Sequence, residues 1–214
     1  MVPQRLGLVH VYTGQGKGKT TAAMGLALRA IGQGFKAYTI QFLKGGAYTG
    51  ELISMKNFLP NEKCGMIQYG KKCVKELKQY KLTGFEKGKD KDKCKYFDYI
   101  REDIDCGNCR HCFLDDQEQR TFSRDAFKHA LDILSKEEHD LVILDEINNA
   151  VHQNYISINE MVGLIQKKAP HIELVLTGRH APKEIIEMAD LVTEMNKIKH
   201  YFDDGVKARR GIEY

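Results

Sequence analysis

The feature that most constrains this chain is the glycine-rich run TGQGKGKTT at residues 13–21. An apolar run of the kind that forms a buried strand, Leu6–Tyr12, comes directly before it. From Lys19 onward the apolar residues recur with a helical period, and Gly32 and Gly34 end that pattern. A strand, a glycine loop and a helix in this order predict the opening unit of an α/β domain.

Further segments extend this alternation of strands and helices over most of the chain. They are a strand at Ala37–Leu43, a helix near Gln119–Ser135, a strand at Leu141–Leu144, a helix opened by the capping-box pair Ser157 and Glu160, a strand at Ile172–Leu176 and a helix with Pro182 in its first turn. Strands that alternate with helices pair in parallel, and the helices cover both faces of the sheet. We therefore expect residues 1–214 to form a single α/β domain with a mostly parallel sheet.

The glycine run also has the chemistry of a phosphate-binding loop, or P-loop. Its glycines allow backbone N–H groups to converge on an anion, and the start of the following helix adds a partial positive charge. Lys19 supplies a mobile cation, and the hydroxyl of Thr20 suits Mg²⁺ coordination. Thr13 departs from the pattern G-x-x-x-x-G-K-[ST], which has glycine at that position. The predicted nucleotide-binding residues of the loop are Gly14, Gln15, Gly16, Lys17, Gly18, Lys19, Thr20 and Thr21.

Two acidic residues close one of the predicted strands. Asp145 and Glu146 follow Leu141–Leu144, and ligands of open α/β sheets gather where the parallel strands end. We therefore predict that Thr20, Asp145 and Glu146 hold Mg²⁺. The predicted catalytic residues are Lys19, Thr20 and Glu146.

Two arginines are further candidates for nucleotide contacts. Arg179 follows the predicted strand Ile172–Leu176 and is able to bind a phosphate through two N–H groups. Arg29 lies on the helix that follows the P-loop. A solvent-exposed side chain is the alternative for each of them.

All six cysteines lie between Cys64 and Cys112, within a lysine-, glycine- and aspartate-rich interval, residues 61–116, that we interpret as an insertion. Three of them form a C-x-x-C-x-x-C run, whose thiolates are able to surround one metal centre. The predicted ligands are Cys106, Cys109 and Cys112, with a fourth from Cys94, Cys73 or Cys64. Four thiolates suit Zn²⁺, and a compact run with a remote cysteine also suits a [4Fe–4S] cluster. The residues leave this choice open, and thiols without a metal are the alternative.

Composition excludes a membrane protein and gives little evidence for a charged partner. No stretch approaches about 18 consecutive apolar residues. Removing the first apolar run as a signal peptide would destroy the P-loop motif, so we expect a cytoplasmic protein. The net charge is only +4, and the lysine-rich run Lys71–Lys95 also contains acidic residues. Nucleic acid is therefore not an expected partner.

Several segments of the chain together carry a resemblance to a known family. They are the P-loop region Val11–Ala23, the segment Gln41–Gly45 with Gly50-Glu51, the acidic strand end Leu144–Glu146, the turn Leu176–Arg179, and the C-terminal blocks Lys199–Ala208 and Gly211–Tyr214. These segments resemble the ATP:corrinoid adenosyltransferases, and the C-terminal blocks do so almost residue for residue. The resemblance covers residues 5–58 and 117–214.

The resemblance implies a RecA-like P-loop fold and an enzyme that uses ATP, Mg²⁺ and a corrinoid. In such an enzyme the Co(I) of a reduced corrinoid attacks C5′ of ATP, and the P-loop, Lys19 and Mg²⁺ stabilise the departing triphosphate. By matching position, the resemblance implies that Gly14, Gly16, Gly18, Lys19 and Thr20 bind phosphate. It implies that Thr20 and Glu146 hold Mg²⁺ and that Arg29 contacts the nucleotide. A homodimer is typical of the family, and reduction of the cobalt implies a reductant protein as a further partner.

The corrinoid side of the resemblance is incomplete, and two other functions stay as alternatives. The chain contains no tryptophan, and Ala47 stands where the family's second-strand motif often has one, so the corrinoid is not identified. A nucleoside kinase with a zinc-held lasso would use Glu51 or Asp145 as its base. A non-catalytic, ATP-dependent nucleic-acid-binding module would use the lysine run and the insertion. Neither alternative accounts for the C-terminal blocks.

Overall fold

The computed structural model describes residues 6–45, 49–57, 59–60, 62–73 and 116–213. The strands within these ranges are β1 Val9–Thr13, β2 Ala37–Phe42, β3 Cys64–Tyr69, β4 Leu141–Asp145, β5 Glu173–Thr177 and β6 Leu191–Glu194. The helices within them are α1 Lys19–Gly32, α2 Gly50–Asn57, α4 Gln117–Lys136, α5 Ile147–His152, α6 Ile158–Lys167 and α7 Lys183–Met188.

In the part of the chain that the structure describes, the strands form one sheet in the order β3-β2-β4-β5-β1-β6, and every neighbouring pair is parallel. The predicted α/β class with a parallel sheet is confirmed. β5 lies between β1, which leads into the P-loop, and β4, which ends at Asp145. One strand thus separates the loop from the acidic strand end, which agrees with the expected RecA-like fold.

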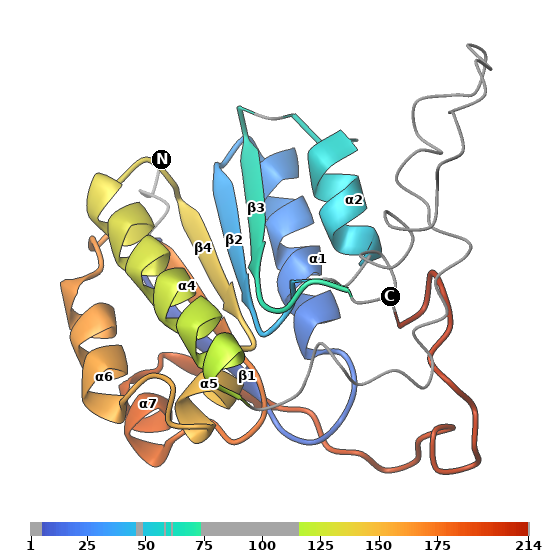
Figure 1. The fold of residues 1–214 in the computed structure, drawn as a ribbon. Coiled ribbons are helices and arrows are strands. Elements are labelled where there is room, and N and C mark those ends of the chain that lie inside the picture. Colours follow the sequence, from blue (N-terminus) through green and yellow to red (C-terminus); the bar gives the residue numbers. More distant parts are fainter. Residues whose placement is uncertain (1–5, 46–48, 58, 61, 74–115, 214) are drawn as a thin grey trace, which may run out of the picture.

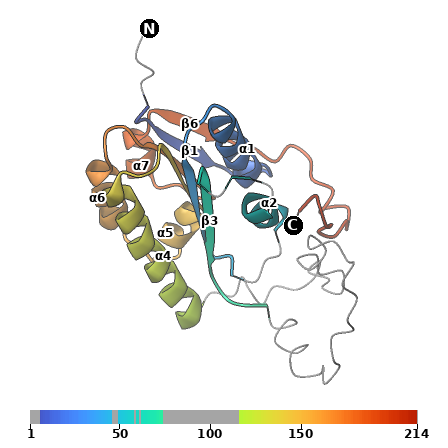
Figure 2. The same ribbon diagram turned by 90° about the horizontal axis from the view of Figure 1, so that it is seen from above.

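Helices cover both faces of this sheet (Figures 1 and 2). α1 and α2 lie on one face, and α4, α5, α6 and α7 lie on the other. Each face has its own apolar core, and β4 contributes to both of them. Val142 and Leu144 pack on the side of α4, whereas Leu141 and Ile143 pack on the side of α1. Burial on both faces explains why the sequence of this strand is apolar without interruption.

The ends of the helices follow from short local signals. Gly18, with φ 117°, stands immediately before α1 in a left-handed conformation that glycine adopts without strain. Ser157 and Glu160 form the predicted capping box at the start of α6. Pro182 is the N-cap of α7 and so stands one residue before the predicted first turn. A proline in either position costs no hydrogen bond, because the helix does not use its missing N–H.

The boundary predicted for the insertion is wrong at its start. The predicted insertion includes residues 64–69, but these residues form β3, which pairs with β2 from Ala37↔Cys64 to Phe42↔Tyr69. Lysine- and glycine-rich neighbours mask this strand in the sequence. Residues 74–115 are outside the described ranges. Lys71, which precedes this interval, forms an ion pair with Asp116, which follows it. Its backbone N–H also donates to Gln119 Oε1 at 3.3 Å, so both flanks of the interval meet beside β3.

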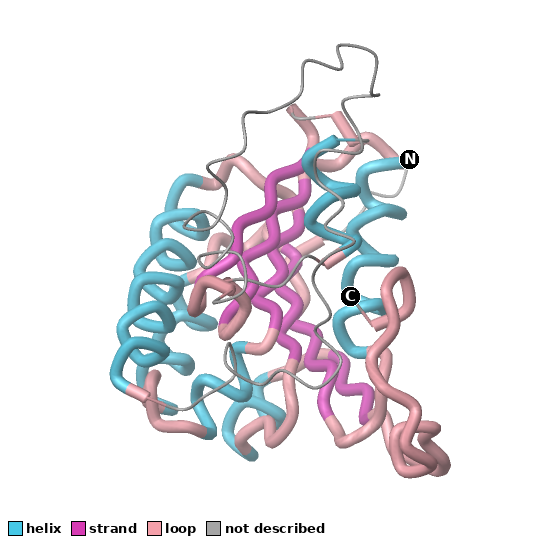
Figure 3. The backbone as a smooth tube through the Cα atoms, turned by 45° about the vertical axis from the view of Figure 1, so that its right-hand side comes forward, coloured by secondary structure: helices cyan, strands magenta, loops and turns pink. Residues whose placement is uncertain are grey.

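After β6 the chain continues without regular strand or helix to residue 213 (Figure 3). This segment, residues 195–213, first crosses the P-loop and then returns toward the start of α1. Among the described helices, none is long and apolar enough to cross a membrane.

Candidate nucleotide site

The P-loop is shaped by glycines that allow close packing against the segment after β6. Gly14 has φ 95°, and a Cβ on it would lie 2.5 Å from the carbonyl oxygen of Met195. A Cβ on Gly16 would lie 2.6 Å from the same oxygen. The N–H of Gly16 donates to that carbonyl at 2.6 Å. These two glycines are therefore required by the packing of the loop against Met195.

Lys19 places a positive charge at the centre of the loop. Its Nζ donates to the carbonyl oxygens of Gly14 and Gly16, each at 2.7 Å, and the residue is only 7% exposed. Burial lowers the pKa of Lys19, and the nearby carboxylates of Glu146 and Asp145 oppose that shift. The loop thus encloses the Lys19 ammonium, and binding of an anionic ligand by this cation stays a prediction.

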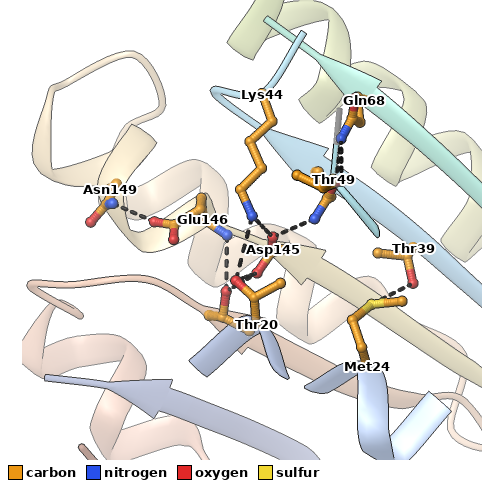
Figure 4. Close-up of polar contacts among 11 residues, drawn as sticks. Thr20, Met24, Thr39, Lys44, Thr49, Gln68, Asp145, Glu146 and Asn149 are labelled. Atoms are coloured by element: carbon orange, nitrogen blue, oxygen red, sulfur yellow. Dashed lines mark hydrogen bonds and ion pairs between the residues drawn. The ribbon is translucent and has the colours of Figure 1, made fainter. Parts of the chain in front are cut away.

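The structure brings Asp145 and Thr20 into direct contact. Asp145 Oδ1 accepts a hydrogen bond from Thr20 Oγ1 at 2.9 Å (Figure 4). It also accepts one from Thr177 Oγ1 at 2.6 Å. Its Oδ2 accepts from Lys44 Nζ at 2.8 Å and from Gln41 Nε2 at 2.9 Å. Burial alone would raise the pKa of Asp145, but the Lys44 ammonium and these hydrogen bonds hold it below its usual range.

Glu146 lies beside this cluster in a left-handed conformation, with φ 63°, at the start of α5. Its N–H donates to Thr177 Oγ1 at 2.9 Å, and its carboxylate accepts a short hydrogen bond from Asn149. Burial and the neighbouring Asp145 carboxylate raise the pKa of Glu146. A divalent cation next to this pair would offset the repulsion between the two carboxylates and would favour the ionised form of Glu146. Together with the Thr20 hydroxyl, the two carboxylates are the hard oxygen donors that Mg²⁺ prefers, so the donor atoms suit the ion by their chemistry.

The structure separates the two predicted arginines. Arg179 follows β5, and its N–H donates to Asn149 Oδ1 at 2.8 Å, close to the acidic pair. Its guanidinium also contributes to the pKa shifts of Lys19 and Glu146. Arg29 instead lies exposed in the last turn of α1, about 15 Å along the helix from Lys19 at 1.5 Å per residue. The fold therefore does not bring Arg29 to the P-loop.

Lys17 and Gln15, two further predicted loop residues, form hydrogen bonds to side chains elsewhere in the protein. Lys17 Nζ forms an ion pair with Glu213 at 2.6 Å and donates to Tyr201 OH at 2.8 Å. Its charge is thus directed toward the C-terminal segment. Gln15 Nε2 lies 3.4 Å from Nε2 of His180.

The sequence patterns above assign no site role to Gln41, Lys44, Asn149 or Thr177, which the structure places in the cluster. Lys44 and Asn149 are labelled in Figure 4. A signal was present for some of them. Gln41 and Lys44 lie in a segment similar to the adenosyltransferase family, and Thr177 follows an apolar run in the same way that Asp145 does. Polar residues at successive strand ends are thus the pattern that would have found them.

Cys64 and Cys73, two of the predicted metal ligands, lie at opposite ends of β3. Cys64 begins the strand, and its thiol donates to the carbonyl oxygen of Pro60 at 3.3 Å. Burial raises the pKa of this thiol. Cys73 is also buried but lies four residues beyond Tyr69, the end of β3, and the strand itself spans about 17 Å from Cys64 to Tyr69 at 3.3 Å per residue. The other four ligands, Cys94, Cys106, Cys109 and Cys112, lie outside the described residues.

The parallel sheet, the loop around Lys19 and the acidic end of β4 define a P-loop nucleotide-binding protein of the RecA-like type. The model of one family, described as ATP:corrinoid adenosyltransferase BtuR/CobO/CobP, matches residues 5–116 and 78–214. The chain belongs to this family.

Individual relatives agree with that assignment. The corrinoid adenosyltransferase of Escherichia coli K12 is 33% identical over 208 residues, which cover 97% of this chain and 86% of the relative. That of a Sinorhizobium species is 32% identical over 210 residues, covering 97% and 80% of the two chains. The corrinoid adenosyltransferase CobA of Salmonella typhimurium is 31% identical over 208 residues, covering 97% and 86%. The predicted family and the predicted class of enzyme, a transferase, are confirmed, and the kinase and nucleic-acid alternatives are not favoured.

Proposed function

We propose that this protein transfers the 5′-deoxyadenosyl group of ATP to the Co(I) of a reduced corrinoid. The cobalt donates an electron pair to C5′, a cobalt–carbon bond forms, and the C5′–oxygen bond breaks with its electrons leaving on the triphosphate. The observation that carries the assignment is the match to the adenosyltransferase family, and the hydrogen bond of 2.9 Å between Thr20 and Asp145, beside a loop that encloses the Lys19 ammonium, supports the ATP site that the reaction needs. Membership of the family adds the substrates.

The residues of the site suit a reaction whose leaving group is a whole triphosphate. Lys19 and the N–H groups of the loop would bind the phosphate oxygens and stabilise the charge that develops on them. Thr20, Asp145 and Glu146 would hold Mg²⁺, which when bound supplies further neutralisation of the triphosphate. Arg179 would contact the same polyphosphate. Because the attacking atom is cobalt, no general base is needed, and Asp145, which accepts four side-chain hydrogen bonds, is poorly suited to act as one.

Incubation with ATP and chemically reduced cobalamin is the direct test. We expect light-sensitive adenosylcobalamin and free triphosphate, both of which absorbance spectra and phosphate chromatography measure. Absence of product with every reduced corrinoid tried, from protein that binds Mg-ATP, would contradict the proposed transfer.

Replacing Lys19 tests the role of the loop. Lys19→Ala removes the central cation, and we expect kcat to fall by about 10²–10³-fold, the usual effect of losing one transition-state donor. Lys183→Ala is the matched control, because Lys183 is 86% exposed and pairs only with Glu187 one turn along α7 in the described structure. Unchanged turnover in Lys19→Ala would remove the loop from the mechanism.

The cysteines and the assembly state complete the proposal. Cys106, Cys109 and Cys112, with Cys94, Cys73 or Cys64, would bind Zn²⁺ or a [4Fe–4S] cluster, supported by their spacing alone. Metal analysis of anaerobically purified protein distinguishes stoichiometric zinc from iron with sulfide, and neither metal would refute the site. A cytoplasmic homodimer that receives electrons from a reductant protein is the form we expect, and sedimentation at a range of concentrations tests the dimer.

A further inference from the structure

Lys44 lies where the hydroxyl and carboxylate oxygens of the magnesium site meet. Its ammonium donates to Asp145 Oδ2 at 2.8 Å and to Thr20 Oγ1 at 3.4 Å (Figure 4). Asp145 is 0% exposed and the Lys44 side chain is 14% exposed. In the described structure, a positive charge from the protein therefore stands between two of the residues proposed to hold the metal.

The backbone around Lys44 is built to keep this side chain in place. Leu43, which is buried, takes a left-handed conformation with φ 60°, an arrangement that costs a non-glycine residue energy. The N–H of Lys44 donates to the carbonyl of Tyr69 at 3.1 Å, at the end of β3. Gly45 then passes so close to Gly70 that a methyl group on it would overlap the backbone there. Strain and close packing on both sides distinguish Lys44 from a lysine on an open surface.

The hydrogen bonds of Asp145 leave a metal ion no free place on its carboxylate. A carboxylate offers about four acceptor positions, and Asp145 receives donors from Thr20, Thr177, Gln41 and Lys44. Entry of Mg²⁺ at this carboxylate thus requires one of these donors to leave.

Lys44 is the donor best able to move. Gln41 is fixed by Gln68, whose Nε2 donates to Gln41 Oε1 at 2.7 Å. Thr177 is fixed by the Glu146 N–H at 2.9 Å. Lys44 carries its charge on a flexible stem of four carbons, which is able to swing while its backbone stays pinned. A cation that leaves is also replaced by a cation, so the buried carboxylate is never left without a partner.

We propose that Lys44 is a positioning residue that holds Thr20 and Asp145 together in the metal-free protein and is displaced by Mg²⁺ when Mg-ATP binds. The inference rests on the magnesium site of the proposed function. The polyphosphate arrives together with the metal, so the released ammonium gains an anionic partner at the moment it loses Asp145.

Metal binding without nucleotide tests the exchange. We expect Lys44→Met to bind Mn²⁺, measured as loss of the free-ion signal in electron paramagnetic resonance, roughly tenfold or more tightly than the unaltered protein, because the competing charge is gone. Mn²⁺ should also raise the Tm of Lys44→Met and leave that of the unaltered protein nearly unchanged. Lys183→Met, an exposed lysine on α7, should behave like the unaltered protein. Equal Mn²⁺ affinity in Lys44→Met and the unaltered protein would overturn the inference.

The unaltered protein gives a second measurement that does not depend on the folding of a variant. The coupling through the hydrogen bond between ¹⁵Nζ of Lys44 and ¹³Cγ of Asp145 should be present in metal-free protein and vanish on addition of Mg²⁺ with ATP. Persistence of this coupling in protein saturated with Mg-ATP would show that Lys44 is a permanent counter-ion and would refute the exchange.

Asp145→Asn separates this inference from the proposal on which it rests. If the substitution leaves the affinity for Mn-ATP unchanged, the magnesium site itself is wrong, and the exchange falls with it. If it weakens Mn-ATP binding while Lys44→Met gains no Mn²⁺ affinity, the site stands and only the role of Lys44 is refuted.

Discussion

The hydroxyl of Thr177 bridges two neighbouring acidic residues, Asp145 and Glu146, by hydrogen bonds. It donates to Asp145 Oδ1 at 2.6 Å and accepts from the Glu146 N–H at 2.9 Å, and the residue is fully buried. A hydroxyl is able to donate and accept at the same time, which a side chain of the same shape without oxygen cannot do. The position of the acidic pair thus depends on a residue at the end of the adjacent strand, β5.

Thr177→Val tests this role with almost no change of shape. We expect the free energy of unfolding to fall by about 1–3 kcal/mol, because the substitution leaves the Glu146 N–H without its partner and removes one of the two hydrogen bonds to the buried Asp145 Oδ1. Urea denaturation of metal-free protein measures the change. Thr193→Val, at an exposed position of β6, is the matched control and should shift stability by no more than about 0.5 kcal/mol. Equal effects of the two substitutions would argue against the bridging role.

The site residues that were predicted are those whose chemistry is visible locally. Lys19 and Thr20 belong to a contiguous loop pattern, and Asp145 ends an apolar run. The role of Gln41 depends instead on the register of β2 against β4, which pairs Gln41 with Asp145. Pairing between strands about 100 residues apart is not encoded in either strand alone, so the sequence reveals the polar residue but not its partner.

At the scale of elements, the helices and strands that can be predicted are those with a strong pattern of apolar residues. α4 and α6 carry clear apolar faces, and β4 is apolar throughout because it is buried on both sides. β6 is exposed at each of its four positions and adds to the sheet mainly through backbone hydrogen bonds with β1. Such an edge strand leaves no apolar pattern in the sequence. The order of the strands, including the place of β5 between the two halves of the site, follows from packing and not from any local signal.

The capping box of α6 predicts a dependence of stability on pH. The Ser157 N–H, which donates to Glu160 at 2.9 Å, and then Arg124 lower the pKa of Glu160 below its ordinary value of 4.5. Its carboxylate therefore stabilises the fold above pH 4.5, and this contribution is lost as the pH falls through the lowered pKa. Glu160→Gln should be less stable than the unaltered protein at pH 7, and the difference should close in acid. Glu184→Gln, in the first turn of α7, is the control; a difference for Glu160→Gln that stays constant with pH would contradict the assignment.

At the scale of the whole molecule, the P-loop and the C-terminal segment form one structure. Lys17 meets Glu213 and Tyr201, and Arg209 lies over the Tyr201 ring at 4.7 Å. Arg209 also donates its backbone N–H to Glu213 Oε2 at 2.6 Å. The blocks whose sequence most specifically resembles the family are thus the ones that contact the loop, which gives a physical reason for their specificity.

Glu213→Gln should loosen this contact without touching the sheet. We expect tryptic cleavage after Lys207 and Arg209 to become about two- to tenfold faster, because the charged partner of Lys17 is removed and the segment opens more often. Mass spectrometry of timed digests measures the rates. Glu187→Gln, which removes an exposed ion pair on α7, should leave them unchanged. An unaltered cleavage rate in Glu213→Gln would mean that the segment is held by other contacts.

The neighbours of β1 have a consequence for how the protein matures in the cell. In the described sheet, the strand that carries the P-loop pairs with β5 and β6, residues 173–177 and 191–194, and with no strand closer to it in sequence. During synthesis it emerges from the ribosome before both of its partner strands, and its backbone stays unpaired with them until more than 160 further residues have been added. The nucleotide pocket of a nascent chain therefore forms only late in translation, so ATP cannot bind and stabilise the chain during the early steps of its folding.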